Sequence, residues 1–164
     1  MFERFGEFDS AEEINRAAAA QLAEGDLDAV FAIAEENGID REEAQDYIDG
    51  YCDRLVANPL MAAYGKLDVE ERDLDPKEIM KDWADYIRVR CSEDGRIAVA
   101  VRKKGKSLKG CIAELLMWSF KNQQAVDKDI LKAAGVSVKV TLGIPGMGRA
   151  KKAITQYYLG EVGE

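Results

Sequence analysis

The 164-residue chain contains no histidine. Histidine is the side chain that titrates nearest to neutral pH, and it is the commonest ligand of protein-bound zinc. Its absence excludes Ser-His-Asp and Cys-His nucleophilic arrangements and removes the commonest general base. We therefore expect a protein that binds a macromolecule, that is not an enzyme, and that needs neither a cofactor nor a metal.

Cysteine is scarce as well. Cys52, Cys91 and Cys111 are odd in number and widely spaced, and no C-x-x-C pair occurs. This pattern fits neither a disulfide framework nor a structural zinc site. We expect three reduced and largely buried thiols, as is typical of cytosolic proteins.

Long apolar runs are missing too. The longest, CIAELLMWSF, is far below the roughly 18 residues that span a bilayer, and it carries Glu114. The N-terminal sequence MFERFGEFDS has no basic region followed by an apolar run, so it does not predict a signal peptide. We expect no membrane association and a chain that stays in the compartment where it is made.

Charge is divided unevenly along the chain. Residues 1–94 hold 26 acidic and 10 basic side chains, net −16, and residues 95–164 hold 5 acidic and 13 basic side chains, net +8. Length and composition are those of one globular domain. We expect a single domain over 1–164, with an acidic helical part (1–94) and a basic α/β part (95–164). The two parts either serve different electrostatic tasks or neutralise each other.

Helix-start signals recur through the acidic part. Ser10 and Glu13 form a capping box, and Asp26 and Asp40 are suited to cap the next two helices. The second of these is expected to extend over REEAQDYIDGYCDRLV. Asn58–Pro59 predicts a short helix through LMAAYG, and Asp75–Pro76 predicts the start of a further helix, KEIMKDWADYIRVRC.

The basic part mixes helical and strand patterns. Residues 97–101 suit either a strand or a short helix, whereas Ser107 is followed by a strongly apolar helix. Alternating valines over VSVKVTLGI predict a strand, which needs a partner in residues 97–101 or in another protein. The fold class is therefore α+β, mainly α-helical with a small minor β element near residues 136–142.

One basic cluster lies beside the predicted helix start at Ser107, where lysine and arginine charges and backbone N–H groups could hold phosphate. The alternative is a solvated loop that balances the acidic part. The cluster consists of Arg102, Lys103, Lys104, Lys106 and Lys109. The same stretch, AVRKKGKS, approximates a phosphate-binding P-loop, but Ala100 replaces the first glycine, so nucleotide hydrolysis is not expected.

A second basic cluster follows a glycine-rich turn. In GIPGMGRAKK, Arg149, Lys151 and Lys152 come after glycines spaced G-x-x-G-x-G, which is not the dinucleotide-binding order. The stretch is either a phosphate-backbone contact for DNA or RNA or a plain tight turn before the last helix.

Acidic side chains are dense between residues 35 and 53. They either keep helices solvated or present a negative surface to a basic groove, as a nucleic acid would. The candidates are Glu35, Glu36, Glu42, Glu43, Asp46, Asp49 and Asp53. No D-x-[DN]-x-[DN]-G calcium loop occurs among them.

Several segments together resemble small proteins carried by phages and conjugative elements of gut Firmicutes. These segments are FGEFDSAEEINRAAAAQLAEGD, ENGIDREEAQDYIDGY, NPLMAAYGKL, VRKKGKSLKGCIAEL and LGIPGMGRAKKAITQYYLG. Some members of this group look like anti-CRISPR proteins directed at the RNA-guided DNA nuclease of type II systems.

The resemblance implies a stoichiometric inhibitor of a bacterial type II CRISPR nuclease, acting in the cytoplasm of the bacterial host cell. The acidic helices would engage the nuclease, and the basic residues would contact DNA or guide RNA. The alternative is a DNA-binding accessory protein of a phage or conjugative element, with the basic residues as its site. Neither role fixes an oligomeric state.

Overall fold

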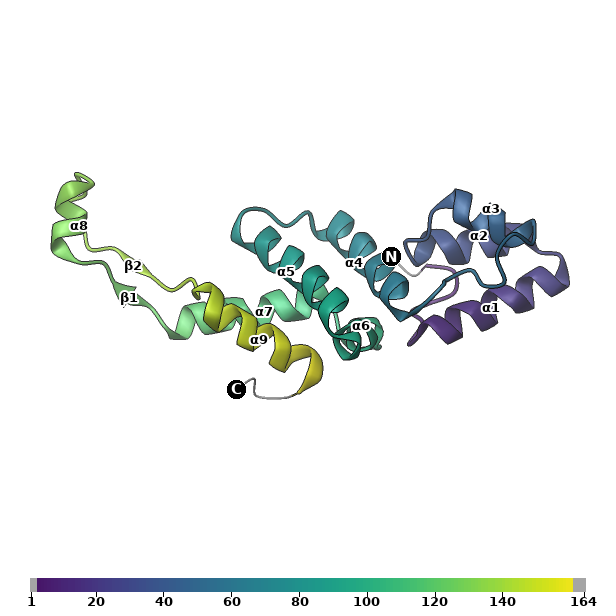
Figure 1. The fold of residues 1–164 in the computed structure, drawn as a ribbon. Helices are drawn as coiled ribbons and strands as arrows, with labels where there is room; N and C mark the ends of the chain where they lie inside the picture. The colour runs from purple at the N-terminus through teal and green to yellow at the C-terminus, as the bar shows by residue number, and fades with distance from the viewer. Residues whose placement is uncertain (1–2, 161–164) are drawn as a thin grey trace. The chain divides into compact units, whose positions relative to one another are not determined.

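The computed structural model describes residues 3–160, and helices dominate that range (Figure 1). The chain divides into two compact units, one up to Lys109 and one from Gly110. The prediction of a mainly helical fold with a minor β element is confirmed. No helix within residues 3–160 is both long and apolar enough to cross a membrane.

The first unit begins with three helices, α1 (Ala11–Glu24), α2 (Leu27–Glu36) and α3 (Arg41–Ile48). As predicted, the Ser10 hydroxyl accepts the Glu13 amide proton, at 3.2 Å, and the Asp26 carboxylate accepts that of Ala29, at 3.0 Å. Consecutive helices pack against each other around buried apolar side chains. These include Ile14, Val30, Ile33, Ala44 and Tyr47.

Three further helices complete the first unit. They are α4 (Pro59–Leu74), α5 (Ile79–Glu93) and α6 (Gly95–Arg102), and each packs against the other two. α4 starts at Pro59 as predicted and is capped by Asn58, and Asp94 caps α6. Residues 97–101, for which the sequence pattern allowed either a strand or a short helix, are helical. They bury Ile97, Ala98 and Val101 and expose Val99, as a helical period requires.

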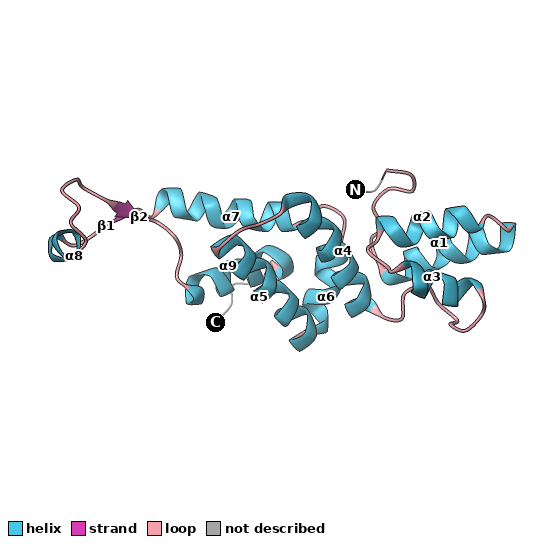
Figure 2. Cartoon of the chain, turned by 90° about the horizontal axis from the view of Figure 1, so that it is seen from above, coloured by secondary structure: helices cyan, strands magenta, loops and turns pink. Residues whose placement is uncertain are grey.

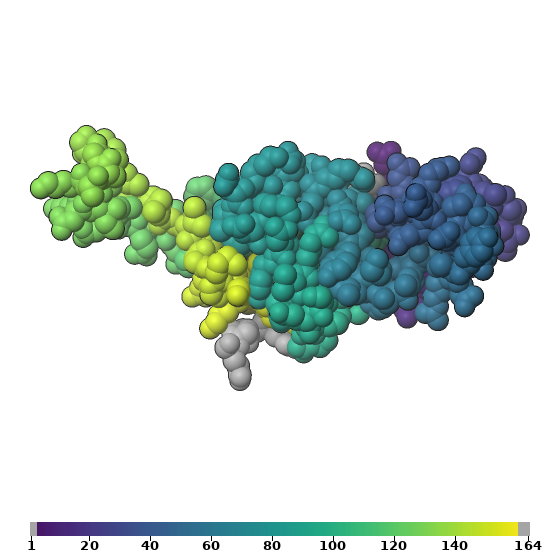
Figure 3. Space-filling view, turned by 45° about the horizontal axis from the view of Figure 1, so that its top comes forward, coloured from purple at the N-terminus to yellow at the C-terminus, as the bar shows by residue number. Residues whose placement is uncertain are grey.

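The second unit contains α7 (Leu108–Lys121), whose first two residues belong to the first unit, and α9 (Met147–Leu159). Between them an arm is formed by β1 (Gln124–Ala125), α8 (Lys128–Ala133) and β2 (Thr141–Leu142). β1 and β2 pair antiparallel at the base of the arm and α8 lies at its tip (Figure 2). The arm forms a separate lobe of this unit (Figure 3).

The strand predicted over 136–142 is present only at its end. Thr141 and Leu142 pair with Ala125 and Gln124, so the partner is neither residues 97–101 nor another protein. The valine alternation was misleading because no sheet face covers it. Val138 is 66% exposed and Leu142 is 59% exposed.

Two helix boundaries in the acidic part were predicted wrongly. α3 ends at Ile48, because Gly50 adopts φ +80° and closes the helix. Asp75–Pro76 does not start a helix. Asp75 ends a longer α4, its amide donating to the Glu71 carbonyl at 2.8 Å, and α5 begins only at Ile79.

The boundary between the compact units differs from the division by charge at residue 94. α6, which lies in the basic part of the sequence, packs on the acidic helices α4 and α5. That the two units form a single domain stays a prediction.

Candidate functional site

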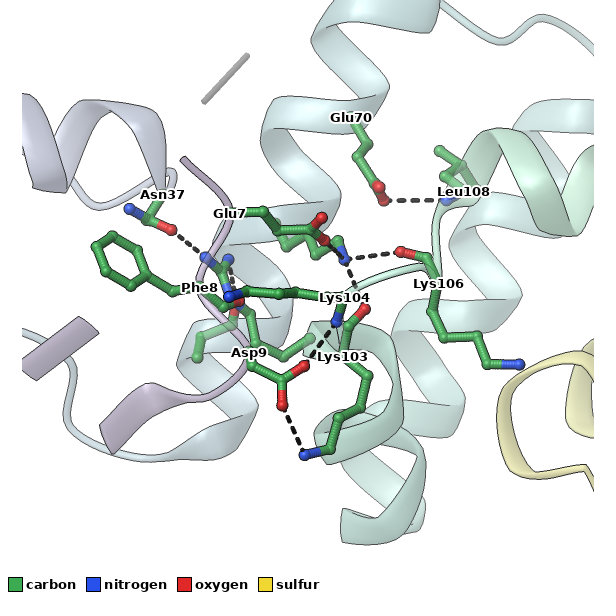
Figure 4. A network of polar contacts seen from close by, with 12 residues as sticks. Glu7, Phe8, Asp9, Asn37, Glu70, Lys103, Lys104, Lys106 and Leu108 are labelled. Carbon is green, nitrogen blue, oxygen red and sulfur yellow. Dashed lines mark hydrogen bonds and ion pairs between the residues drawn. The ribbon is translucent and has the colours of Figure 1, made fainter. Parts of the chain in front are cut away.

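Arg102, the first residue of the basic cluster, lies in the interior of the first unit, where it is 1% exposed. Its Nε donates to the Phe8 carbonyl, at 3.1 Å, and its Nη2 donates to the Asn37 side-chain oxygen (Figure 4). Burial lowers the pKa of Arg102 to about 10, so the guanidinium remains charged at neutral pH. Arg102 therefore fixes the N-terminal segment to α2, and we leave it out of the proposed binding surfaces.

Asp9 binds the next two residues of the cluster. Its carboxylate accepts the Lys104 amide proton, at 2.8 Å, and forms an ion pair with the Lys103 ammonium, at 3.1 Å. The hydrogen bond from the Lys104 amide, followed by that from the Lys103 side chain, holds the pKa of Asp9 below its usual range. Part of the positive charge of this loop is thus used within the chain.

Lys66 of α4 binds the same loop. Its ammonium, on a side chain that is 1% exposed, donates to the carbonyls of Lys103 and Lys106, at 3.2 and 2.7 Å, and to the Glu7 carboxylate, at 2.5 Å (Figure 4). These carbonyls point inward, toward a cation of the protein. A helix precedes the loop, whereas a P-loop follows a strand.

Glu70 lies one helical turn after Lys66 and is also buried. Its carboxylate accepts the amide proton of Leu108, the first residue of α7, at 3.1 Å. Burial is the largest cause of a pKa raised to about 7, and the positive charge of Lys66 opposes it. Lys66 and Glu70 were missed by the sequence analysis, although their i,i+4 spacing among Ala62, Ala63 and Leu67 was visible.

The remaining members of the basic cluster are accessible. Lys103, Lys104 and Lys109 are exposed and Lys106 is half-buried. Lys106 and Lys109 border a hollow of about 470 Å³ whose lining also includes Glu7, Glu70 and Asp73. The surface of this loop therefore has mixed charge.

Most of the predicted acidic residues are accessible as well. Glu36 is the exception, because its carboxylate accepts the amide protons of Arg4 and Phe5 and holds the N-terminal segment. We define the acidic surface as those of the predicted carboxylates that are exposed. They are Glu35, Glu42, Glu43, Asp46, Asp49 and Asp53.

Part of the acidic surface borders a groove of about 590 Å³. Glu43, Asp46 and Asp53 contribute to its lining, together with Asp40 and Asp68, which were not among the predicted site residues. Glu35 instead borders a smaller hollow of about 390 Å³ with Arg41 and Arg72. The structure thus brings together three of the predicted carboxylates in one groove.

The second basic cluster lies on α9 of the second unit. Arg149, Lys151 and Lys152 are all exposed, and the Arg149 guanidinium lies over the Trp118 ring, 5.6 Å from its centroid. Trp118, the aromatic neighbour of Arg149 on α7, was not part of the predicted site.

Cys52, Cys91 and Cys111 are free thiols, as predicted, but Cys52 is exposed. Burial raises the pKa of the Cys91 thiol to about 12, so that it stays protonated. Within residues 3–160, acidic and cysteine side chains form no group of three or more that could hold a metal ion.

Comparison with known proteins identifies no relative from which a role could be transferred: no protein-family model, curated protein or solved structure matches this chain.

Proposed function

We propose that the chain is a stoichiometric inhibitor of a bacterial type II CRISPR RNA-guided DNA nuclease. In this proposal it acts in the cytoplasm of the bacterial host cell and binds the nuclease through the acidic surface. Inhibition by binding requires no catalytic residue and no cofactor in the inhibitor. The nuclease as the target rests on the sequence resemblance, whereas the binding surface is supported by the geometry of the first unit.

The observation that carries the proposal is the groove lined by Glu43, Asp46 and Asp53. No ion pair among residues 3–160 involves any of the three carboxylates. Arg54 is the basic side chain in the lining. The lining therefore holds more carboxylates than cations, which produces a negative local potential that is complementary to a positively charged surface.

A type II nuclease offers such a surface. It holds the guide–target heteroduplex in a positively charged channel, and it reads the short motif beside its target with arginines. The carboxylates of a folded helical unit can occupy the positions that nucleic-acid phosphates take in this channel. The proposal therefore predicts competition with target DNA.

The test is cleavage of a target plasmid by a purified type II effector nuclease with its guide, while this protein is titrated in. Cleavage should fall to zero near equimolar protein. The triple variant Glu43→Gln, Asp46→Asn, Asp53→Asn should require at least about tenfold more protein, since each lost charge contact contributes on the order of 1 kcal/mol.

The matched control is Glu12→Gln, Glu24→Gln, Asp28→Asn. It removes the same charge from exposed positions of α1 and α2 outside the groove lining, and it should inhibit like the parent. Full cleavage at large excess of the parent protein, across several nuclease orthologues, would end the CRISPR proposal. Equal loss in both triple variants would show that only net charge matters.

The alternative role, a DNA-binding accessory protein of a mobile element, is supported by the exposed Lys103, Lys104 and Lys109. It predicts a gel shift of duplex DNA without nuclease, one that weakens steeply with salt. Charge reversal at Lys103, Lys104 and Lys106 should abolish that shift. An unchanged shift in this variant would exclude the cluster as the DNA site.

A further inference from the structure

α7 and α9 present matching faces to a groove of about 570 Å³ in the second unit. The α7 residues of the lining follow the spacing i, i+3, i+4, i+7, at Glu114, Met117, Trp118 and Lys121. Those of α9 follow the same spacing with one further residue at i+8, at Arg149, Lys152, Ala153, Gln156 and Tyr157. This is the period of one helix face. The groove therefore lies between two helical stripes.

Aromatic and cationic groups are combined in this groove. Trp118 and Tyr157 are half-buried, and Met117 beside them is 51% exposed. The Arg149 guanidinium lies over the Trp118 ring at 5.6 Å, which aligns a charge with an aromatic plane. Rings held in this way can accept a flat, apolar ligand group next to a negatively charged one.

The charge of the groove favours an anion. Three cations, Lys121, Arg149 and Lys152, stand against one carboxylate, that of Glu114. None of the three cations takes part in an ion pair within residues 3–160. Their charges remain available to a ligand.

We propose that the groove between α7 and α9 binds single-stranded nucleic acid, with Trp118 as a base-stacking platform and Lys121, Arg149 and Lys152 as phosphate contacts. Aromatic rings can stack only on bases that are not enclosed in a duplex, and this combination of rings and cations is the one that single strands require. An acidic peptide would use the cations but would offer no base to stack on the rings. The proposal is independent of the nuclease proposed above.

The test uses the full chain, without nuclease, and a fluorescein-labelled single-stranded oligonucleotide of about 12 nucleotides, a length in the range of known single-strand sites. Fluorescence anisotropy should show binding to the single strand that is at least about tenfold tighter than to the duplex of the same sequence. Binding should also quench tryptophan emission, through Trp118 rather than through Trp83, which is 4% exposed.

Two variants separate stacking from charge. Trp118→Leu should weaken single-strand binding about tenfold, the usual effect of removing one stacked ring, whereas Trp118→Phe should retain most of the affinity. Lys121→Gln with Lys152→Gln should reduce the slope of log affinity against log salt by about 0.7 per removed contact. Lys128→Gln with Lys132→Gln removes two exposed charges from α8 and should leave the slope unchanged.

Equal affinity for single strand and duplex, together with no effect of Trp118→Leu, would overturn the proposal in favour of a general polyanion surface. Competition by polyglutamate at the same concentration as the oligonucleotide would overturn it in favour of a peptide groove. No binding by the folded parent protein would overturn it outright. None of these results depends on whether nuclease cleavage is inhibited.

Discussion

Gly38, in the turn between α2 and α3, and Gly65 of α4 meet backbone to backbone. A Cβ on Gly38 would lie 2.1 Å from the Gly65 carbonyl oxygen, and a Cβ on Gly65 would lie 2.1 Å from the Asn37 carbonyl oxygen. Both obstacles are main-chain atoms, which cannot move aside as a flexible side chain can. This contact fixes the distance between the first three helices and α4.

Gly65→Ala should therefore lower the free energy of unfolding by about 2–3 kcal/mol, the usual cost of forcing an extra methyl group into a tightly packed contact. Urea denaturation followed by circular dichroism would measure it. Gly95→Ala, at the start of α6, is the matched control, because its Cβ would meet nothing within 4 Å. Equal stability of the two variants would mean that the helices separate at little cost.

Replacement of Arg102 should be far more destabilising than replacement of its neighbour. Arg102→Met leaves the Phe8 carbonyl and the Asn37 side chain without their donor, and it removes a cation from beside Glu7 and Glu70. We expect a loss of about 3 kcal/mol in the free energy of unfolding. Lys103→Met, at an exposed position, should change it by less than about 0.5 kcal/mol. Similar losses in both variants would contradict the interior role of Arg102.

Glu70 should make stability fall as the pH rises. Its pKa is about 7 in the folded chain, where burial raises it and Lys66, Leu108 and Arg102 partly compensate, against 4.5 as its ordinary value. Between these pH values the folded chain binds the additional proton, so the free energy of unfolding decreases with rising pH and levels off above about pH 7.

Glu70→Gln keeps an acceptor for the Leu108 amide but does not titrate. Across the window from about pH 5 to about pH 8 it should lose on the order of 1–3 kcal/mol less stability than the parent. Asp73→Asn, an exposed carboxylate of the same helix, is the control and should follow the parent. Parallel curves for parent and Glu70→Gln would show that Glu70 is ionised throughout.

Gly143 should be essential for the base of the arm. A Cβ there would lie 2.3 Å from the Ser119 carbonyl oxygen of α7 and 2.1 Å from the Gln123 Nε2. Gly143→Ala should push β2 away from α7 and raise amide hydrogen exchange at Val126, whose N–H donates to the Val140 carbonyl at 2.9 Å. Gly148→Ala, with no atom near its Cβ, should leave this exchange rate unchanged.

Local signals in the sequence were sufficient for most helix starts. Ser10, Asp26 and Asn58 each cap through a hydrogen bond to the residue three positions later, so the whole interaction lies within the pattern that predicts it. The prediction of a helix start at Asp75–Pro76 was wrong because the same residue types also end helices. Asp75 adopts φ 45°, the left-handed conformation that closes α4.

Long-range relationships were not predictable. Arg102 belonged to a run of basic residues and looked like a surface group, yet the partners that bury it, Phe8 and Asn37, lie 94 and 65 residues away. β1 is two residues, Gln124–Ala125, with no strand pattern of their own. The groove between α7 and α9 likewise required two helix faces far apart in the sequence.

Residues 7–9 of the N-terminal segment are anchored by side chains that are synthesised much later. Phe8 and Asp9 form hydrogen bonds with Arg102, Lys103 and Lys104, and Glu7 forms one with Lys66. At synthesis rates of about 5–20 residues per second, on the order of 5–20 seconds separate the emergence of Phe8 from that of Arg102. During that interval α1, α2 and α3 can pack on each other and Glu36 can already hold Arg4 and Phe5, while residues 7–9 lack their partners on α4, at the end of α6 and in the loop after it. Docking of residues 7–9 is thus a late event in synthesis, and a ribosome that stalls before α6 leaves them open to proteases.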